Sequence, residues 1–127
     1  MAAIELPASL LEPVLNTGRQ RWVVALSGGL DSTVLLHWLS STVSRWQLDG
    51  DVAGQIELRA IHINHGLNSD ANHWAELCQQ QCDALNIPLV VAAVQVDQAA
   101  GLGLEGAARE ARYAAFRAEL SDDELLL

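Results

Sequence analysis

The stretch Ser27-Gly28-Gly29-Leu30-Asp31-Ser32 determines how the rest of this sequence is interpreted. It follows the apolar run at residues 22–26 and precedes a helix-like segment. A strand, a turn of small residues and a helix form an anion site, because the first amides of a helix have no partner inside it. Glycine lets the backbone turn sharply and approach a phosphate closely. The stretch therefore predicts a phosphate-binding loop.

Asp31 is the unusual member of this loop, because a carboxylate repels a phosphate unless a cation lies between them. A Mg²⁺ ion on the phosphates would bridge the two, and the hydroxyls of Ser27 and Ser32 would add donors. The alternative is an ordinary strand-to-helix turn in which Asp31 or Ser32 caps the helix. Paired glycines, serines and an acid after an apolar strand favour the nucleotide interpretation. The Walker-type lysine and the dinucleotide G-x-G-x-x-G spacing are both missing from the loop.

Composition limits the class of protein. The chain has 127 residues, half of them apolar, which is enough for one domain with a core. No apolar run approaches the length of a membrane span, and the N-terminus is a poor secretory signal. Since the two cysteines make no disulfide framework, we expect a cytoplasmic protein with no membrane partner. A net charge of −9 argues against nucleic-acid binding by this segment alone.

Apolar periodicity predicts an α/β fold. An unbroken apolar run at residues 22–26 and an almost wholly apolar run at residues 89–96 are typical of strands in a parallel sheet, and a further strand is expected at residues 56–63. Segments with helical spacing alternate with them, at about residues 32–46, 69–85 and 104–120. We expect an open parallel sheet of βαβ units with helices on both faces. Residues 125–127 resemble the start of a fourth strand, so the domain of residues 21–127, after a lead-in at residues 1–20, is expected to be truncated there.

Three further groups of residues are candidates for function. On the second helix, the inner face is expected to comprise Trp74, Leu77, Cys78, Gln81 and Leu85. Cys78 and Cys82 are four residues apart, and small buried hydrophobes are a stronger interpretation than a redox or metal pair.

His62 and His65 follow the second strand, at the sheet edge where open parallel sheets bind ligands. Pocket or substrate contacts and satisfied structural histidines are equally serious interpretations; a metal pair would lack an evident third ligand. Arg109 and Arg112 share a helix face, and their spacing alone favours a solvated, salt-bridged surface over a pair of cations facing a polyanion.

The six-residue loop resembles the S-G-G-x-D-S signature of the N-type ATP pyrophosphatases of the PP-loop superfamily. Two more segments, residues 61–67 (Ile-His-Ile-Asn-His-Gly-Leu) and 105–113 (Glu-Gly-Ala-Ala-Arg-Glu-Ala-Arg-Tyr), make residues 21–127 similar to the tRNA(Ile)-lysidine synthetase family. The resemblance implies an adenine nucleotide alpha hydrolase-like fold and a two-step ligase. ATP adenylates the wobble cytidine of tRNA(Ile) with a CAU anticodon, and free L-lysine then displaces AMP to form lysidine. Whether the protein is a homodimer is left open.

The same resemblance implies roles for individual residues. The ATP phosphates would be held by Ser27, Gly28, Gly29, Leu30, Asp31 and Ser32, with Asp31 catalytic and placing Mg²⁺. The backbone around Ile61 and His62 would meet the adenine, and His65 would contact the substrate. Arg109 and Arg112 would be catalytic and would contact phosphate, cytidine or tRNA, which reverses the interpretation from spacing alone.

Two alternatives remain beside the ligase. The first is another PP-loop ATP pyrophosphatase, of the tRNA thiolation or amidotransferase synthetase type, although Cys78 and Cys82 lack the C-x-x-C spacing of thiolation relatives. The second is a non-catalytic nucleotide-binding module. The family's H-x-x-D-D-x-x-E-T-type motif and its tRNA-gripping C-terminal domains do not occur in these residues.

Overall fold

A parallel sheet forms the centre of the molecule. The structure, a computed structural model, describes residues 8–27, 29–50, 55–64, 70–94 and 103–127. Its sheet has four strands in the order β3-β2-β1-β4, and every neighbouring pair is parallel. The strands are β1 (Arg21–Ala25), β2 (Glu57–Asn64), β3 (Leu89–Ala93) and β4 (Glu124–Leu126). The predicted open α/β fold is confirmed, and residues 124–126 do form a strand beside β1.

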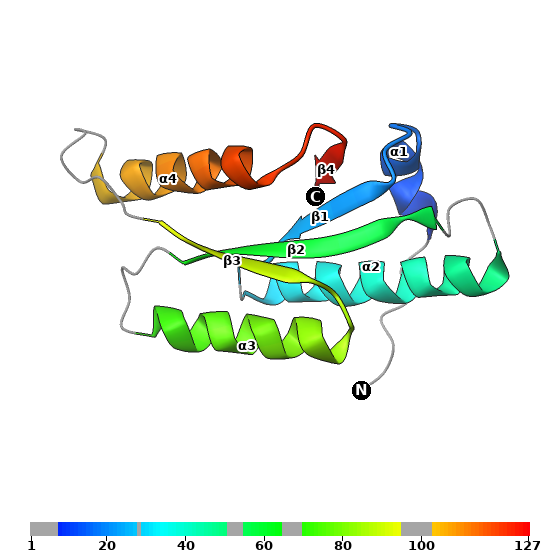
Figure 1. The fold of residues 1–127 in the computed structure, drawn as a ribbon, viewed down its shortest axis with the longest axis horizontal. Helices are drawn as coiled ribbons and strands as arrows, with labels where there is room; N and C mark the ends of the chain where they lie inside the picture. The colour runs from blue at the N-terminus through cyan, green and yellow to red at the C-terminus, as the bar shows by residue number, and fades with distance from the viewer. Residues whose placement is uncertain (1–7, 28, 51–54, 65–69, 95–102) are drawn as a thin grey trace.

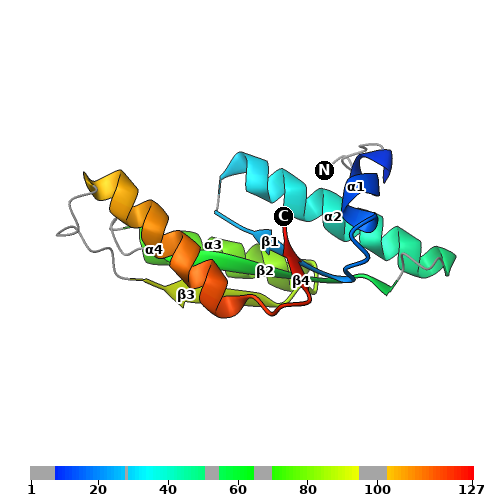
Figure 2. The same cartoon turned by 90° about the horizontal axis from the view of Figure 1, so that it is seen from above.

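Helices cover both faces of this sheet, as the sequence predicts. Figure 1 shows α2 and α3 on one face and α4 on the other. The same view from above places the short N-terminal helices beside α2 (Figure 2). The bounds are η1 (Ala8–Leu11), α1 (Glu12–Leu15), α2 (Leu30–Asp49), α3 (Ala71–Ala84) and α4 (Gly103–Glu119). Helices on both faces explain why Trp22, Val23 and Val24 of β1 are all apolar and buried.

Helix α2 is longer than its apolar stripe predicts. It continues past Trp46 to Asp49 and ends at Gly50, which has a φ of 68°. The Gly50 amide bonds back to the carbonyls of Gln47 and Trp46. Residues 47–49 contain no helix breaker, so the helix runs on to the first residue that adopts the left-handed conformation without strain.

The core lies in two layers. The larger layer packs Trp22 and Leu26 against Leu36 and Leu39 of α2 and against the buried cysteines of α3. Its Trp22 ring meets the Trp46 ring edge-on, with 6.2 Å between centroids. The smaller layer places Phe116 of α4 over the opposite face of the sheet. Both layers hold β1 in the middle, directly before the predicted phosphate loop.

The predicted inner face of α3 is only partly correct. Cys78 and Cys82 are buried, whereas the side chains of Trp74 and Leu77 remain 48% and 41% exposed. Strand β3 is an edge strand, so the sheet beneath α3 is narrow and covers a single row of side chains. The apolar spacing of the sequence indicated a wider stripe than the neighbouring strands can cover.

Candidate functional site

The predicted phosphate loop lies at the carboxyl end of the central strand. Strand β1 ends at Ala25, Leu26 is buried, and α2 begins at Leu30. Figure 1 shows that the strands end, and α2, α3 and α4 begin, on the same side of the molecule. Ligands of open parallel sheets bind at this edge, next to helix N-termini. The loop is therefore where the chemistry predicted from its sequence requires it to be.

Hydroxyl groups organise the loop. The Ser27 amide donates to the Ser32 Oγ at 3.1 Å, and the two serine hydroxyls lie 2.9 Å apart. The Gly29 amide donates to the Ser27 Oγ at 3.2 Å. The Thr33 hydroxyl donates to the Gly29 carbonyl at 2.8 Å. These exposed bonds hold a small ring of polar atoms at the start of α2, open to solvent.

Gly29 leaves open space at the loop rather than making its turn. Its φ of −79° and ψ of 171° are extended values that any residue adopts, so the sharp turn predicted for the glycines does not occur at this position. A Cβ built on Gly29 would meet one atom within 4 Å, the Ser27 Oγ at 3.4 Å. The missing side chain therefore gives a ligand close access to the backbone. Gly28 lies outside the described residues.

The first turn of α2 presents an acidic side chain to solvent. Asp31 is exposed and is the acidic residue of that turn. No hydrogen bond or ion pair joins its carboxylate to another described residue. Leu30 beside it is 77% exposed. An unpaired carboxylate at a helix N-terminus can coordinate a hard cation such as Mg²⁺.

The predicted adenine contacts lie in β2, next to β1. Ile61 is fully buried, and its carbonyl accepts the Leu26 amide at 2.9 Å. His62 is 4% exposed, and its Nδ1 lies 2.7 Å from the Leu26 carbonyl oxygen. The structure thus brings both residues to the entrance of the phosphate loop through Leu26. His65 lies outside the described residues.

The predicted arginine pair occupies the exposed surface of α4. Arg109 and Arg112 are both exposed, and the Arg109 guanidinium lies 5.4 Å from the centre of the Tyr113 ring. No described hydrogen bond or ion pair connects either arginine to residues 27 or 29–32. Figure 1 places the first half of α4 on the side where the strands end. Helix α4, which carries the pair, covers the opposite face of the sheet from α2, and Arg112 belongs to its second half.

The cysteines behave as small core residues. Burial raises the pKa of Cys82 to about 11, with smaller contributions from Cys78 and Asp83, and burial also raises the pKa of Cys78. A thiol with a raised pKa is a poor nucleophile and a poor metal ligand. Within the described ranges, no cluster of three or more histidine, cysteine or acidic side chains could hold a metal ion.

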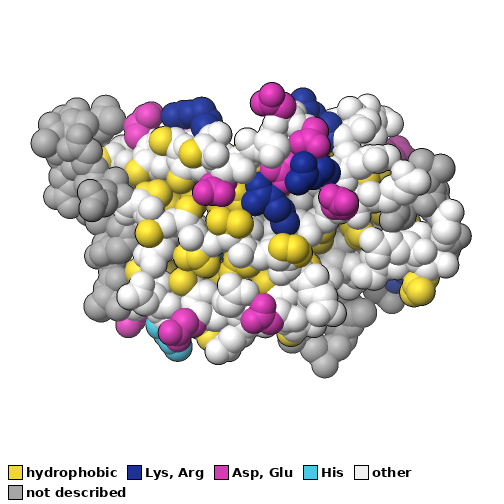
Figure 3. Space-filling view, viewed as in Figure 1, with side chains coloured by type: hydrophobic (Ala, Val, Ile, Leu, Met, Phe, Trp, Pro, Cys, Tyr) yellow, Lys and Arg dark blue, Asp and Glu magenta, His cyan; other side chains and the backbone are white. Residues whose placement is uncertain are grey.

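A second polar cluster lies at the opposite end of the sheet. Arg59 of β2 holds Glu124 of β4 with two bonds, Nε to Oε2 at 2.6 Å and Nη2 to Oε1 at 2.7 Å. These bonds are the largest cause that lowers the pKa of Glu124 from 4.5 to about 2, against the opposing effect of burial. Arg21 pairs with Asp123 and Glu57 at 3.2 Å and 3.5 Å. Figure 3 shows basic and acidic side chains side by side over β4 and the start of β1.

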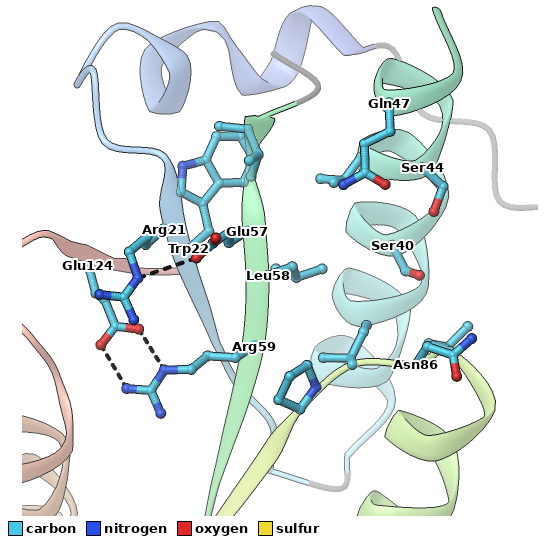
Figure 4. Close-up of a pocket in the computed structure, with 15 residues that line it drawn as sticks. Arg21, Trp22, Ser40, Ser44, Gln47, Glu57, Leu58, Arg59, Asn86 and Glu124 are labelled. Carbon is cyan, nitrogen blue, oxygen red and sulfur yellow. Dashed lines mark hydrogen bonds and ion pairs between the residues drawn. The ribbon is translucent and has the colours of Figure 1, made fainter. Parts of the chain in front are cut away.

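The cluster borders a hollow of about 610 Å³. Figure 4 shows Ser40, Ser44 and Gln47 of α2 on one side of it and Arg59 with Glu124 on the other. It lies at the amino ends of the strands, away from the ligand edge. Apolar periodicity missed this cluster; the detectable signal was Arg59, a charged residue inside β2, a strand that also carries Glu57, His62 and Asn64.

None of the helices in the described ranges has the length and apolarity needed to cross a bilayer.

Comparison with known proteins supports the interpretation of the loop. The family model of an ATP-binding PP-loop domain matches residues 4–127. A tRNA(Ile)-lysidine synthase of Xanthomonas axonopodis pv. citri (strain 306) is 47% identical over 121 residues, covering 95% of this chain and 24% of that protein. One of Serratia proteamaculans (strain 568) is 51% identical over 105 residues, covering 83% and 22%. The chain spans about a quarter of the length of these curated relatives. Since the family model covers nearly the whole chain, the chain belongs to the family of PP-loop domains.

Proposed function

We propose that this chain is the ATP-handling part of a ligase that joins lysine to the wobble cytidine of tRNA(Ile) with a CAU anticodon. The observation that carries the proposal is the polar ring of Ser27, Gly29 and Ser32 at the start of α2, in a chain similar to proteins named tRNA(Ile)-lysidine synthase. The reaction has two steps, adenylation of the cytidine and displacement of AMP by the ε-amine of free lysine. The protein's task in both is positioning and charge neutralisation.

The loop suits a triphosphate in shape and chemistry. The amides at the start of α2 and the Ser27 and Ser32 hydroxyls would donate to phosphate oxygens, and the open space beside Gly29 admits them. Asp31 would hold Mg²⁺ through a carboxylate oxygen. The bound ion would offset the charge of the phosphates as pyrophosphate leaves. Asp31 is therefore assigned the catalytic role in this part of the site.

The remaining site residues would act on the cytidine and on RNA. Arg109 and Arg112 present two exposed cations on the surface of α4, and guanidinium groups bind phosphate oxygens in pairs. They are assigned to phosphate, to the activated cytidine or to the tRNA backbone. The backbone at Ile61 and His62 is assigned to the adenine edge, and His65 to the substrate. The chain has a net charge of −9. These two arginines would supply local positive charge where RNA approaches.

A thiolation enzyme of the same superfamily is the less favoured alternative. That chemistry needs accessible, reactive cysteines, whereas Cys78 and Cys82 are buried and have raised pKa values. The observation therefore favours ligation over thiolation.

The test fuses residues 1–127 to the remaining part of the Xanthomonas relative, in place of that protein's own matching segment. The fusion and the chain alone are incubated with ATP, Mg²⁺, labelled lysine and tRNA(Ile) with a CAU anticodon. Lysine-dependent AMP release with label in the RNA supports the proposal. AMP release without lysine incorporation would indicate another PP-loop reaction, and ATP binding without AMP release in the fusion would indicate a non-catalytic module.

A further inference from the structure

Leu26, the residue before the phosphate loop, is held by β2 at both of its backbone polar groups. Its amide donates to the Ile61 carbonyl at 2.9 Å. Its carbonyl oxygen lies 2.7 Å from the Nδ1 of His62. The first bond continues the strand pairing, but the second comes from a side chain. The His62 imidazole thus fixes the backbone at the residue where β1 leads into the loop.

The His62 bond also sets the direction of the next amide. A peptide unit is planar and trans, so the Leu26 carbonyl and the Ser27 amide point in opposite directions. Fixing the carbonyl toward His62 therefore aims the Ser27 N–H the other way, where it meets the Ser32 Oγ at 3.1 Å. The Ser32 hydroxyl in turn lies 2.9 Å from the Ser27 hydroxyl. The His62 side chain of β2 therefore orients the ring of polar atoms that would bind phosphate.

The surroundings of His62 keep its Nδ1 in contact with the Leu26 carbonyl oxygen. The side chain is 4% exposed, and the Cys78 sulfur of α3 lies 3.7 Å from the same nitrogen. A carbonyl oxygen only accepts hydrogen bonds, so Nδ1 must carry the proton. Helix α3, through Cys78, packs beside the ring and limits its rotation.

The geometry points to His62 as a positioning residue of the phosphate loop: its imidazole holds the Leu26 carbonyl and thereby orients the Ser27 amide onto the Ser32 hydroxyl, one of the proposed phosphate ligands. The inference rests on the proposed ATP-binding role of the loop and adds a side-chain role to a residue assigned there only a backbone contact with adenine.

Substitutions separate this role from simple packing. In His62→Asn, the side-chain amide nitrogen falls near the place of Nδ1 and can still donate, whereas His62→Leu keeps bulk without a donor. We expect His62→Leu to weaken Mg·ATP binding by roughly tenfold, the scale of one lost hydrogen bond. His62→Asn should bind within about threefold of the unsubstituted chain. Cys82→Ala, which removes a fully buried atom of the same core layer, should lower thermal stability and leave the affinity unchanged.

Calorimetry with Mg·ATP, well below each melting temperature, gives the affinities. Equal affinity of His62→Leu and the unsubstituted chain would overturn the inference. So would an equal loss in His62→Asn and His62→Leu, because the donor would then be irrelevant.

Two measurements without nucleotide keep this inference separate from the proposed function. Nitrogen-15 correlation spectra of the unsubstituted chain should show the proton on Nδ1 of His62; a proton on Nε2 alone would end the proposal. Amide hydrogen exchange at Ser27 and Gly29 should be faster in His62→Leu than in Cys82→Ala. If ATP does not bind at all, the proposed function fails, while exchange and the proton position still decide whether His62 orients the loop.

Discussion

The two ends of the parallel sheet use their polar groups in opposite ways. At the carboxyl end, Ser27 and Ser32 form exposed bonds among themselves, and Asp31 has no partner among the described residues. At the amino end, Arg59 and Glu124 satisfy each other in a buried, two-bonded pair. An unpaired carboxylate and exposed hydroxyls in an open loop can bind a ligand, whereas charges already paired with each other hold strands together. The proposed binding loop and the ion pair that holds the strands therefore lie at opposite ends of one set of strands.

The hollow at the amino end illustrates this separation. It is an open hollow of about 610 Å³, and the charged groups that border it are already paired (Figure 4). The loop at the other end is exposed, and its serine hydroxyls are held by hydrogen bonds within the loop. The candidate site in this protein is distinguished by polar groups that are available to a ligand, rather than by the size of a cavity.

Removing the Asp31 carboxylate should have the most severe consequence. We expect Asp31→Ala to lower AMP release by the fusion protein by at least about a hundredfold, the scale of removing one electrostatic element of an active site. Its melting temperature should not change, because the side chain is exposed and unpaired among the described residues. Steady-state assays and thermal unfolding measure the two effects. Asp83→Ala, at an exposed acid near the end of α3, is the control; activity retained in Asp31→Ala would contradict the assignment of the loop.

The buried pair at the amino end should show the reverse pattern. Glu124→Gln leaves Arg59 without its counter-charge, and we expect the free energy of unfolding to fall by about 3 kcal/mol. Affinity for Mg·ATP should not change. Urea unfolding and calorimetry test both parts, with Asp123→Asn, at an exposed pair, as a control of little effect. A loss of ATP affinity in folded Glu124→Gln would show that the two ends are coupled.

Acid should weaken the same pair. The folded-state pKa of Glu124 is about 2, below its ordinary 4.5, so its contribution to stability is complete above pH 4.5 and is lost as the pH falls toward 2. The expected loss is about 3 kcal/mol. Unfolding curves of the unsubstituted chain and Glu124→Gln should therefore converge over this range. A stability difference that stays constant from pH 6 to about pH 2 would show that the carboxylate does not titrate with folding.

A milder change in the loop should affect binding alone. Ser32→Ala removes the acceptor of the Ser27 amide, and we expect affinity for Mg·ATP to fall roughly tenfold. The bonds lost are exposed, so stability should change little. Ser41→Ala, at an exposed serine of the same helix, is the matched control. Calorimetry on both variants is sufficient, and equal affinities would indicate that the hydroxyl ring does not shape the site.

Local pattern predicted much of this molecule. The apolar periodicity of the sequence located most strand ends to within one or two residues. It also placed the small-residue loop correctly between β1 and α2. Such features depend on neighbours in sequence, where hydrogen bonding and side-chain spacing act directly. The extension of α2 to Asp49 and the exposure of Trp74 were missed. The first depends on which residue can end a helix, and the second on how wide the sheet is beneath α3.

From its sequence alone, this protein's α/β class, its order of elements and the position of its small-residue loop were already determined, because backbone preference and apolar period are local properties. Only the tertiary structure decided that Arg59 meets Glu124 across 65 positions and that the His62 imidazole turns onto Leu26 across 36. Contacts between distant residues depend on strand order and register. A side chain's partner is chosen only when the sheet has brought both groups together.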